Sequence, residues 1–318
     1  MEGSKPSMSW LHRLKKSNLY FFSQYHPCNF HENSDCLKIK LFFVSILVLT
    51  GAFLQAQTLR RPVAASYTGL GAYSVNHADV FSFTANQASL AQLKNSAVAV
   101  YGERRFLLNE LNNYTATIGL TTSSGNFGLK TNYSGFADYN ETQLGLAYGR
   151  KLGSKLDIGA QFNYNSIRIS NGYGNASAIS FELGTVFHIS DKLNAGIHLN
   201  NPIGGKFGKD QQEKLSSVYG FGIGYDASEK FFISVEIEKE EDQPVNVNAG
   251  FQYKLIPQLL VRAGMATATS SAWLGLGLTI KYFRVDVTTS YHPQLGISPG
   301  LMIIIPLSTK GERKTQNN

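Results

Sequence analysis

The residues of Val245–Leu255 alternate strictly between apolar and polar types. Valine, alanine, phenylalanine, tyrosine and leucine occupy the odd-numbered positions, and asparagine, glycine, glutamine and lysine occupy the even-numbered ones. Side chains of a β-strand point alternately to opposite faces, so this period of two predicts a strand with one apolar face and one polar face. The same pattern recurs along most of the chain.

Fourteen alternating runs follow one another from Ala97 to Ile305. Their spacing accommodates a transmembrane strand of about 9 to 11 residues plus its connection. The predicted strands cover residues 97–102, 114–121, 127–133, 142–150, 156–169, 178–187, 193–200, 218–225, 232–238, 245–255, 259–265, 272–280, 283–291 and 297–305.

The linkers between these runs alternate in length. Short, turn-like linkers such as Ser123–Asn126 follow the even-numbered runs, and most linkers after odd-numbered runs are longer, up to Asn201–Ser217. Outer-membrane barrels have short periplasmic turns and longer extracellular loops, and barrel closure satisfies every backbone group within the hydrocarbon. We therefore predict an all-β fold: a closed antiparallel transmembrane β-barrel at residues 97–306 in the cell outer membrane, of about 14 strands, short turns periplasmic and long loops extracellular. A secreted soluble β-sandwich also alternates, but it does not explain the linker lengths.

Charged residues within the runs fall on the polar face. A charge on the lipid face near the midplane costs about 2 to 4 kcal/mol, so this confinement supports a membrane barrel. The residues predicted to face the lumen are Glu182, Glu236, Arg262, Arg284 and Asp286, together with Gln161 and Asn163. Aromatic residues near the short-turn ends predict an interfacial girdle of Tyr148, Phe187, Tyr225, Phe231, Tyr253, Tyr282 and Phe283.

An apolar run at Leu41–Leu54 follows Lys38-Ile39-Lys40 and precedes a small residue, Ala56. This order predicts a secretory signal peptide within residues 1–56, which is removed. A retained anchor is the alternative, but the run is shorter than the roughly 20 residues that span a bilayer. Residues Met1–Leu37 carry no periodic pattern and represent either a start site assigned too far upstream or a cytoplasmic extension. Cleavage removes both cysteines and leaves no disulfide framework.

Composition narrows the class of protein further. The 43% hydrophobic content and mean hydropathy of −0.14 exclude a disordered chain and a helical membrane protein. Removal of residues 1–56 takes away six of the 29 Lys and Arg residues and three of the 22 Asp and Glu residues, which lowers the net charge from +7 to +4. This mild excess is scattered along the chain, so we expect no nucleic-acid partner. Residues 307–318 form a polar C-terminal tail.

Candidate chemistry is sparse. His77 and Asp79 lie two residues apart without a third ligand at metal spacing, and His198 stands alone on a polar strand face. The acidic run Glu238–Asp242 fits a solvated loop tip or a divalent-cation site. No Ser-His-Asp set or carboxylate pair is evident, so we predict no enzyme activity, no catalytic or metal residues and no cofactor. The loop Asn201–Ser217 is the best candidate surface for a partner.

The segment Arg60–Asn95 lacks alternation and is dominated by small residues. Such a segment can pack in a confined space, and we predict that residues 57–96 form a hatch inside the lumen. Several predicted inner faces are rich in glycine. These glycines provide room for a plug, or they serve strand curvature and twist. They lie at Gly145, Gly149, Gly220, Gly222, Gly224, Gly275 and Gly277.

One stretch carries a family resemblance. The sequence G-L-G-A from Gly69, followed by Asp79, Phe81 and Phe83 and by N-Q-A-S-L-A from Asn86, resembles the N-terminal signature of the fatty-acid-transporter-like outer-membrane barrels. That superfamily includes shorter members associated with type IX protein secretion. The resemblance implies a fourteen-stranded barrel with an inward-folded hatch, although the family usually has Asn-Pro-Ala where this chain has Asn-Gln-Ala. The matching hatch-motif residues are Gly69, Gly71, Asp79, Asn86, Gln87, Ala88 and Leu90.

Two functions from different classes follow. In the first, the barrel lies in outer-membrane lipid and passes small hydrophobic compounds or supports protein secretion. In the second, it is a membrane anchor or docking subunit for type IX secreted proteins, without transport of its own, and its partners are secretion-machinery proteins or cargo.

Overall fold

The computed structural model describes residues 65–170, 174–207 and 213–307. The chain divides into two compact units, Met1–Ala56 and Gln57–Asn318, and every described residue belongs to the second. The predicted signal peptide, the hatch residues before Ala65 and the tail beyond Leu307 lie outside the described residues.

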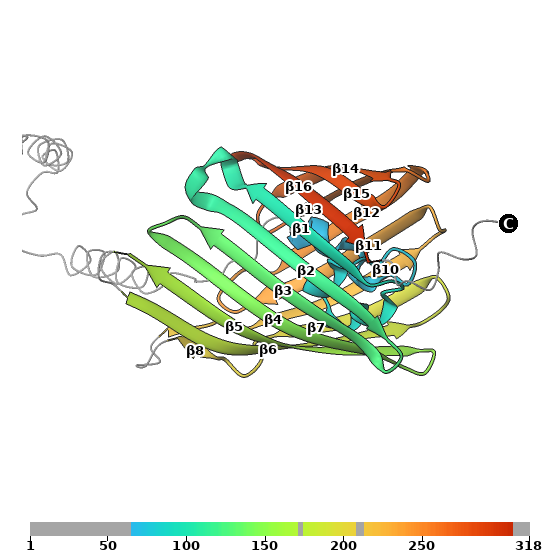
Figure 1. Ribbon diagram of the computed structural model, residues 1–318, viewed down its shortest axis with the longest axis horizontal. Coiled ribbons are helices and arrows are strands. Elements are labelled where there is room, and N and C mark those ends of the chain that lie inside the picture. Colours follow the sequence, from blue (N-terminus) through green and yellow to red (C-terminus); the bar gives the residue numbers. More distant parts are fainter. Residues whose placement is uncertain (1–64, 171–173, 208–212, 308–318) are drawn as a thin grey trace, which may run out of the picture. The chain divides into compact units, whose positions relative to one another are not determined.

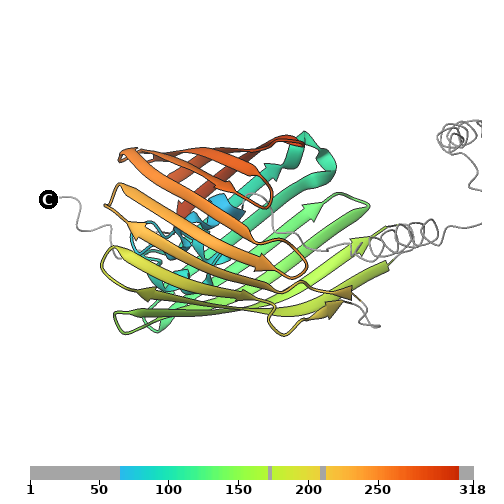
Figure 2. The ribbon, with the colours of Figure 1, turned by 180° about the vertical axis from the view of Figure 1, so that it is seen from behind.

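Fourteen antiparallel strands close into one barrel (Figures 1 and 2), which confirms the predicted fold class. Each barrel strand pairs with the barrel strands that precede and follow it, with β7 next to β10. Strand β1 closes the barrel by pairing with β16 in a register that sets Ala97 opposite Pro306. The barrel strands are β1 (Ala97–Arg104), β2 (Asn112–Thr122), β3 (Gly125–Gly135), β4 (Tyr139–Leu152), β5 (Leu156–Ile169), β6 (Gly174–His188), β7 (Leu193–Asn200), β10 (Val218–Asp226), β11 (Phe231–Glu240), β12 (Asn246–Ile256), β13 (Leu259–Ala266), β14 (Ser271–Ile280), β15 (Phe283–His292) and β16 (Gly296–Pro306).

The long connections carry small elements that the sequence pattern did not predict. A two-stranded ribbon of β8 (Lys206–Phe207) and β9 (Glu213–Lys214) lies between β7 and β10. Two 3₁₀ turns, η4 (Arg105–Leu107) and η5 (Asn109–Leu111), join β1 to β2. Each element has only two or three residues, too few to show a period.

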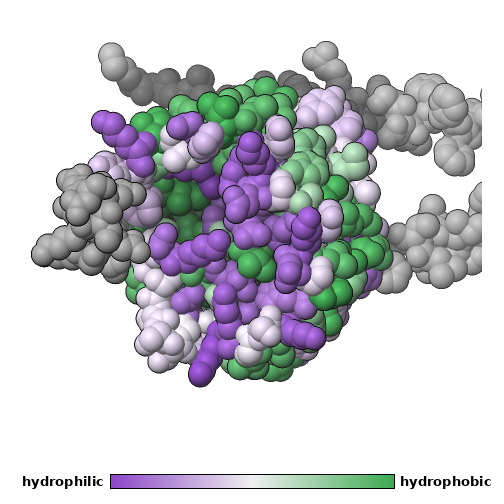
Figure 3. Space-filling view, turned by 90° about the vertical axis from the view of Figure 1, so that its right-hand side faces the viewer, coloured by the Kyte–Doolittle hydropathy of each residue, from purple (hydrophilic) through white to green (hydrophobic). Residues whose placement is uncertain are grey.

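Exposure alternates along the strands as the pattern predicts. In β12, Phe251 is 37% exposed on the outer surface, whereas Gln252 is 4% exposed on the lumenal side. In β14, Leu274, Leu276 and Leu278 are exposed on the outside. Figure 3 views the barrel from its short-turn end, where hydrophilic residues gather across the middle and hydrophobic residues lie on the flanks. This is the surface distribution of a barrel surrounded by lipid.

The described part of the hatch, residues 65–96, lies inside the barrel toward the short-turn end (Figure 1). It folds into α2 (Ala65–Gly69), η1 (Leu70–Tyr73), η2 (Ser82–Thr84) and η3 (Gln87–Gln92). Its large side chains are buried, and those of Tyr67, Phe81 and Phe83 are at most 1% exposed. They share one hydrophobic core with inward-facing wall residues such as Trp273 and Met302. The hatch therefore fills this part of the lumen.

Among the described residues, no helix is long and apolar enough to cross a membrane.

Candidate functional site

The hatch motif turns at Asn86, which caps η3. The Asn86 side chain accepts a hydrogen bond from the backbone nitrogen of Ala88 and donates to the wall carbonyl oxygens of Thr185 and Ile197, at 3.2 and 3.3 Å. Gln87 follows at the first helical position, where the family usually has proline. A proline suits that position because the backbone N–H there needs no helical partner. Here the glutamine serves a second purpose, since its Nε2 donates to Glu182 at 2.6 Å.

Glycines of the inner wall lie where the hatch presses against it. A Cβ atom at Gly184 would lie 2.1 Å from Asn86 Oδ1, and one at Gly159 would lie 2.3 Å from the Gln87 carbonyl carbon. A Cβ at Gly222 would meet the Tyr73 ring at 2.1 Å. Heavy atoms do not approach so closely, so a side chain at any of these positions would force the hatch to shift. Of the two interpretations of the inner glycines, room for a plug is the one these contacts support.

The other glycines predicted on the inner faces differ in what they contact: some make room for the hatch and some pack against the wall itself. Gly224, Gly275 and Gly149 face hatch atoms, whereas Gly145 and Gly277 face wall side chains. At Gly220 a Cβ would lie 3.3 Å from the flexible Glu236 carboxylate, a mildly tight contact. Within the hatch, a Cβ at Gly69 would lie 2.4 Å from Ala85 Cβ, and one at Gly71 would lie 2.5 Å from the carbonyl oxygen of His77. The two motif glycines therefore allow the hatch to fold tightly on itself.

One wall of the lumen holds the hatch through Glu182 on β6, which is 1% exposed. Besides Gln87, it accepts hydrogen bonds from Gln161 at 3.1 Å and Asn163 at 2.8 Å, both on β5. His198 Nε2 on β7 lies 3.1 Å from its second oxygen. We call these five residues the Glu182 cluster. Three amide donors and one imidazole nitrogen therefore surround this buried carboxylate.

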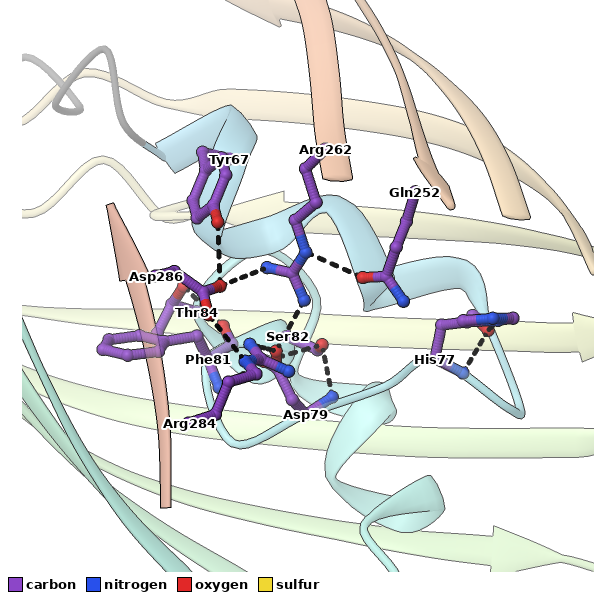
Figure 4. A network of polar contacts seen from close by, with 11 residues as sticks. Tyr67, His77, Asp79, Phe81, Ser82, Thr84, Gln252, Arg262, Arg284 and Asp286 are labelled. Carbon is purple, nitrogen blue, oxygen red and sulfur yellow. Dashed lines mark hydrogen bonds and ion pairs between the residues drawn. The ribbon is translucent and has the colours of Figure 1, made fainter. Parts of the chain in front are cut away.

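The opposite wall holds the hatch through charge pairs centred on Asp79 (Figure 4). Asp79 Oδ2 lies 2.7 Å from an Arg284 nitrogen and 3.0 Å from an Arg262 nitrogen. Arg284 Nε also lies 2.9 Å from Asp286 Oδ1. Asp286 accepts a hydrogen bond from the Tyr67 hydroxyl at 2.8 Å. We call these five residues the Asp79 cluster, in which two carboxylates balance two guanidiniums.

The chemistry around Asp79 favours its ionised form. Burial raises the pKa of the Asp79 carboxyl, but the guanidiniums of Arg284 and Arg262 outweigh burial and hold the pKa below its ordinary value. Burial raises the pKa of the Tyr67 phenol, so its hydroxyl remains a donor. Arg262 also stacks over the Tyr67 ring at 5.1 Å and donates its Nε–H to Gln252 at 2.7 Å.

At the short-turn end, Ser74, His77 and Asp226 come together, a set that was not predicted. The Ser74 hydroxyl donates directly to Asp226 Oδ1 at 2.5 Å, and His77 Nδ1 contacts that same oxygen at 2.9 Å. In a catalytic triad, one histidine nitrogen faces the serine and the other faces the carboxylate. Here the second nitrogen of His77 contacts the backbone carbonyl of Glu229 at 3.2 Å. The set therefore fastens the hatch and is not arranged for nucleophilic catalysis.

The five predicted lumenal charges all point inward. Glu182, Arg262 and Asp286 are at most 2% exposed, while Arg284 and Glu236 are partly buried and contact hatch residues. His77 and Asp79, two residues apart in the sequence, belong to different sets, and His198 pairs with Glu182. In the described part of the chain, no three metal-ligating side chains gather.

Sequence reasoning did not identify three aromatic residues of the site. Tyr67 and Tyr73 lie in the hatch, and Trp273 faces inward from β14. A signal for Trp273 was present, because it occupies the polar register of a strand whose apolar residues sit at the alternate positions. An aromatic residue on the lumenal face indicates contact with protein or ligand.

A cavity of about 170 Å³ lies between the hatch and the wall, toward the long-loop end. Leu70 and Tyr73 of the hatch and Trp273 of the wall line its apolar part. Its polar lining comes mainly from the inner faces of β11 and β12. The charged and amide side chains there are Glu236, Glu238, Glu240, Gln243, Asn246 and Asn248, with Arg105 from the β1–β2 loop.

No protein-family model matches the chain, and no curated protein matches it. Solved structures do match in fold. The toluene transporter TodX of Pseudomonas putida aligns with a TM-score of 0.55 at 9% identity, over 76% of this chain and 98% of TodX. The CymD monoaromatic hydrocarbon channel aligns with a TM-score of 0.54 at 13% identity, over 78% and 97%. A Pseudomonas aeruginosa FadL homologue gives 0.53 at 10% identity, over 78% and 98%. The chain therefore has the fold of the fatty-acid-transporter-like outer-membrane barrels.

Proposed function

We propose that the protein is an outer-membrane barrel that takes up small hydrophobic compounds through a lumen closed by its hatch. The observation that carries this proposal is the cavity between hatch and wall, which combines Leu70, Tyr73 and Trp273 with a polar lining. Ligand sites are typically concave and largely apolar, with a few polar groups that orient the ligand. The toluene transporter and the monoaromatic hydrocarbon channel share this fold, which supports the same class of cargo for this protein.

The packing of the hatch supports uptake by a gated route in preference to a permanent aqueous pore. Aromatic residues and two clusters of buried polar groups occupy the lumen below the cavity. Water and ions would have to displace paired charges there, at a cost of several kcal/mol per uncompensated charge. A bound compound would therefore proceed only when part of the hatch moves. The short turns face the periplasm in this proposal, so the cavity opens toward the exterior.

Uptake should be measured with and without a tethered hatch. Ser66 and Asn248 contact each other across the hatch and β12 at 3.2 Å, so cysteines at both positions can tether the hatch to the wall. The background carries Cys28→Ser and Cys36→Ser. We expect cells producing the protein to accumulate a radiolabelled monoaromatic tracer faster than cells without it. Oxidation of the double-cysteine variant should abolish the difference, and reduction should restore it. Equal uptake with and without the protein would overturn the function.

A second function, docking of secreted proteins, is supported by the β1–β2 loop. Leu107 and Leu108 are each 50% exposed there, and Leu111 is 38% exposed. Phe106 and Leu107 also adopt positive φ angles of 52° and 61°, which non-glycine residues rarely adopt. A loop that holds such a conformation with exposed leucines resembles a contact surface.

Isolation of intact complexes tests this second function. Gentle extraction of outer membranes should return secretion components or cargo with the wild-type protein. The Leu107→Ser/Leu108→Ser variant should lose them while retaining heat-modifiable gel migration, the mark of a closed barrel. Repeated recovery of the barrel alone would refute docking.

A further inference from the structure

We propose that the outer surface of the barrel binds an anionic phospholipid in an apolar groove over β16, β1, β2 and β3, which lie side by side in the wall (Figure 1). One acyl chain lies in the groove, and Arg104 binds the headgroup phosphate. This site is separate from the cavity beside the hatch, so it does not depend on uptake. Three observations carry it: the shape of the groove, its position on the wall and the charge at its end.

The groove forms because small residues stand beside large ones on the outer face. Leu301 and the ring of Tyr114 flank Gly102, and a Cβ at Gly102 would lie 3.3 Å from that ring. The glycine therefore lets the tyrosine ring lie across its neighbouring strand. Ala116 keeps the next cross-strand row low as well. The two rows that line the groove are Leu301, Gly102, Tyr114 and Tyr133, and Ile303, Val100, Ala116 and Thr131.

The groove faces lipid and not the lumen. Val100, Tyr114 and Leu301 are about half-exposed on the outside, whereas Ala99 and Tyr101, which flank Val100 in the sequence, are buried on the lumenal side. The ladders from β16 to β3 continue past this point without a register shift. The groove is therefore a depression in a continuous sheet, and in a membrane the groups that surround it are acyl chains.

The dimensions of the groove suit a single chain. Its volume is about 390 Å³, within the range of about 300 to 1,000 Å³ that is typical of sites for small organic ligands. A chain on a flat wall contacts protein on one side only. A chain in this depression also contacts Leu301 and the Tyr114 ring at its flanks, so it gains dispersion contacts that other wall positions do not offer.

A cation lies at the long-loop end of the groove. Arg104 occupies the next outward position of β1 after Gly102 and is exposed. Glu103 lies between them in the sequence, but it faces the lumen and is buried. In the part of the chain that the structure describes, no carboxylate forms an ion pair with Arg104. An anion from outside the chain can therefore take that place.

Two tyrosines relate this cation to the membrane surface. Tyr114 and Tyr133 lie in the row just below Arg104, with ring centroids 6.5 Å apart. Tyrosine rings gather at the level of the lipid headgroups, and an arginine at that level binds phosphate through its planar guanidinium. The acyl chain and the phosphate of one lipid therefore fit the groove and the arginine together.

Native mass spectrometry of the full-length protein in detergent tests this site. The probes are phosphatidylglycerol and phosphatidylcholine with identical acyl chains, so that they differ in headgroup and only the first is anionic. We expect phosphatidylglycerol to bind about fivefold more tightly, the effect of one arginine near an anionic lipid.

Matched variants assign the binding to the groove and to the arginine. Arg104→Ser should make the two affinities equal, whereas Arg168→Ser, at an exposed outward position of β5, should preserve the preference. Ala116→Phe fills the groove and should reduce both lipids to the level of nonspecific adducts. Ala160→Phe, on the exposed outer face of β5, should not. Heat-modifiable migration verifies that each variant remains a closed barrel.

Three results would overturn the proposal, and none of them bears on tracer uptake. Equal affinity of the wild-type protein for the two lipids, or a preference that survives Arg104→Ser, would refute the headgroup contact. Lipid binding that is unchanged in Ala116→Phe would refute the groove. A dimer that Ala116→Phe dissociates would identify a second copy of the chain as the occupant.

Discussion

The two sides of the hatch are attached to the barrel by different chemistry. On the β12–β15 side, the Asp79 cluster pairs two carboxylates with two guanidiniums. On the β5–β7 side, the Glu182 cluster surrounds one carboxylate with amide and imidazole donors, and wall glycines admit the hatch backbone at close range. The first attachment depends on charge balance, and the second depends on hydrogen bonds to a single carboxylate and on close packing against glycines.

The difference has a mechanical consequence. Buried ion pairs lose much of their stability when one partner is removed, because the other charge remains uncompensated. Close packing against glycine is instead destabilised when a larger side chain replaces the glycine. A hatch held by charge on one side can be released there without disturbing its packing on the other. The Asp79 side is therefore the expected site of opening, and the Glu182 side is the expected pivot.

A buried serine provides a measure of hatch release. Ser89 is 2% exposed, and its hydroxyl has no hydrogen-bond partner among the described residues, so Ser89→Cys makes little change. In a Cys28→Ser/Cys36→Ser background, a maleimide reagent should label this cysteine only when the hatch leaves the wall. The labelling rate then reports the free energy of local opening.

The largest effect is expected from Asp79→Ala. This change leaves Arg262 and Arg284 facing each other with only Asp286 between them, at a cost of about 3 to 5 kcal/mol. Labelling at position 89 should accelerate at least about a hundredfold, since 1.4 kcal/mol corresponds to a factor of about ten. Asp138→Ala, at an exposed loop position, should leave the rate unchanged. Equal rates in the two variants would contradict an electrostatic attachment.

Glu182→Gln should weaken the other attachment less. The substitution places an amide nitrogen among four donors, so some of them lose an acceptor, at about 2 to 3 kcal/mol. Label incorporation should increase tenfold to a hundredfold, which is measurable by mass spectrometry. Gln143→Glu would not test this attachment, because Gln143 is only half-buried and its side chain donates to Asn165, which lies outside the Glu182 cluster. An effect of Glu182→Gln larger than that of Asp79→Ala would reverse the assignment of pivot and opening side.

A smaller effect is expected from added volume. Gly222 and Gly220 lie two residues apart on the same lumenal face of β10. A Cβ at Gly222 would lie 2.1 Å from the Tyr73 ring, whereas at Gly220 the nearest atom is 3.3 Å away, on Glu236. Gly222→Ala should destabilise the seated hatch by about 1 to 2 kcal/mol, and Gly220→Ala should have little effect. Similar labelling rates in this pair would show that Tyr73 yields easily.

Sequence reasoning accounted for the barrel better than for the hatch. The alternation at Val245–Leu255 predicts β12 to within a residue at each end, because membrane strands repeat one local rule. The hatch has no such repeat. Asp79 and Asn86 were singled out by resemblance, but their wall partners lie more than ninety residues away in the chain and depend on closure of the barrel. Pairing of Ser74 with Asp226 was unpredictable for the same reason.

The smallest effect is expected from mild acid. The pKa of Asp79 is lower in the seated hatch than its ordinary value of 3.8, so the seated hatch binds fewer protons than a released one. Acid therefore favours release: the stabilisation is complete above the ordinary pKa and is lost as pH falls through the lower pKa of the seated state. Equilibration of the Ser89→Cys variant between pH 7 and pH 5 should leave the hatch protected. Exposure should increase only below about pH 4, as judged by acid pulses followed by neutral labelling. Asp79→Asn should remove this component, because its side chain cannot titrate, whereas Asp138→Asn should retain it. An acid response that persists in Asp79→Asn would place the sensitive group elsewhere in the protein.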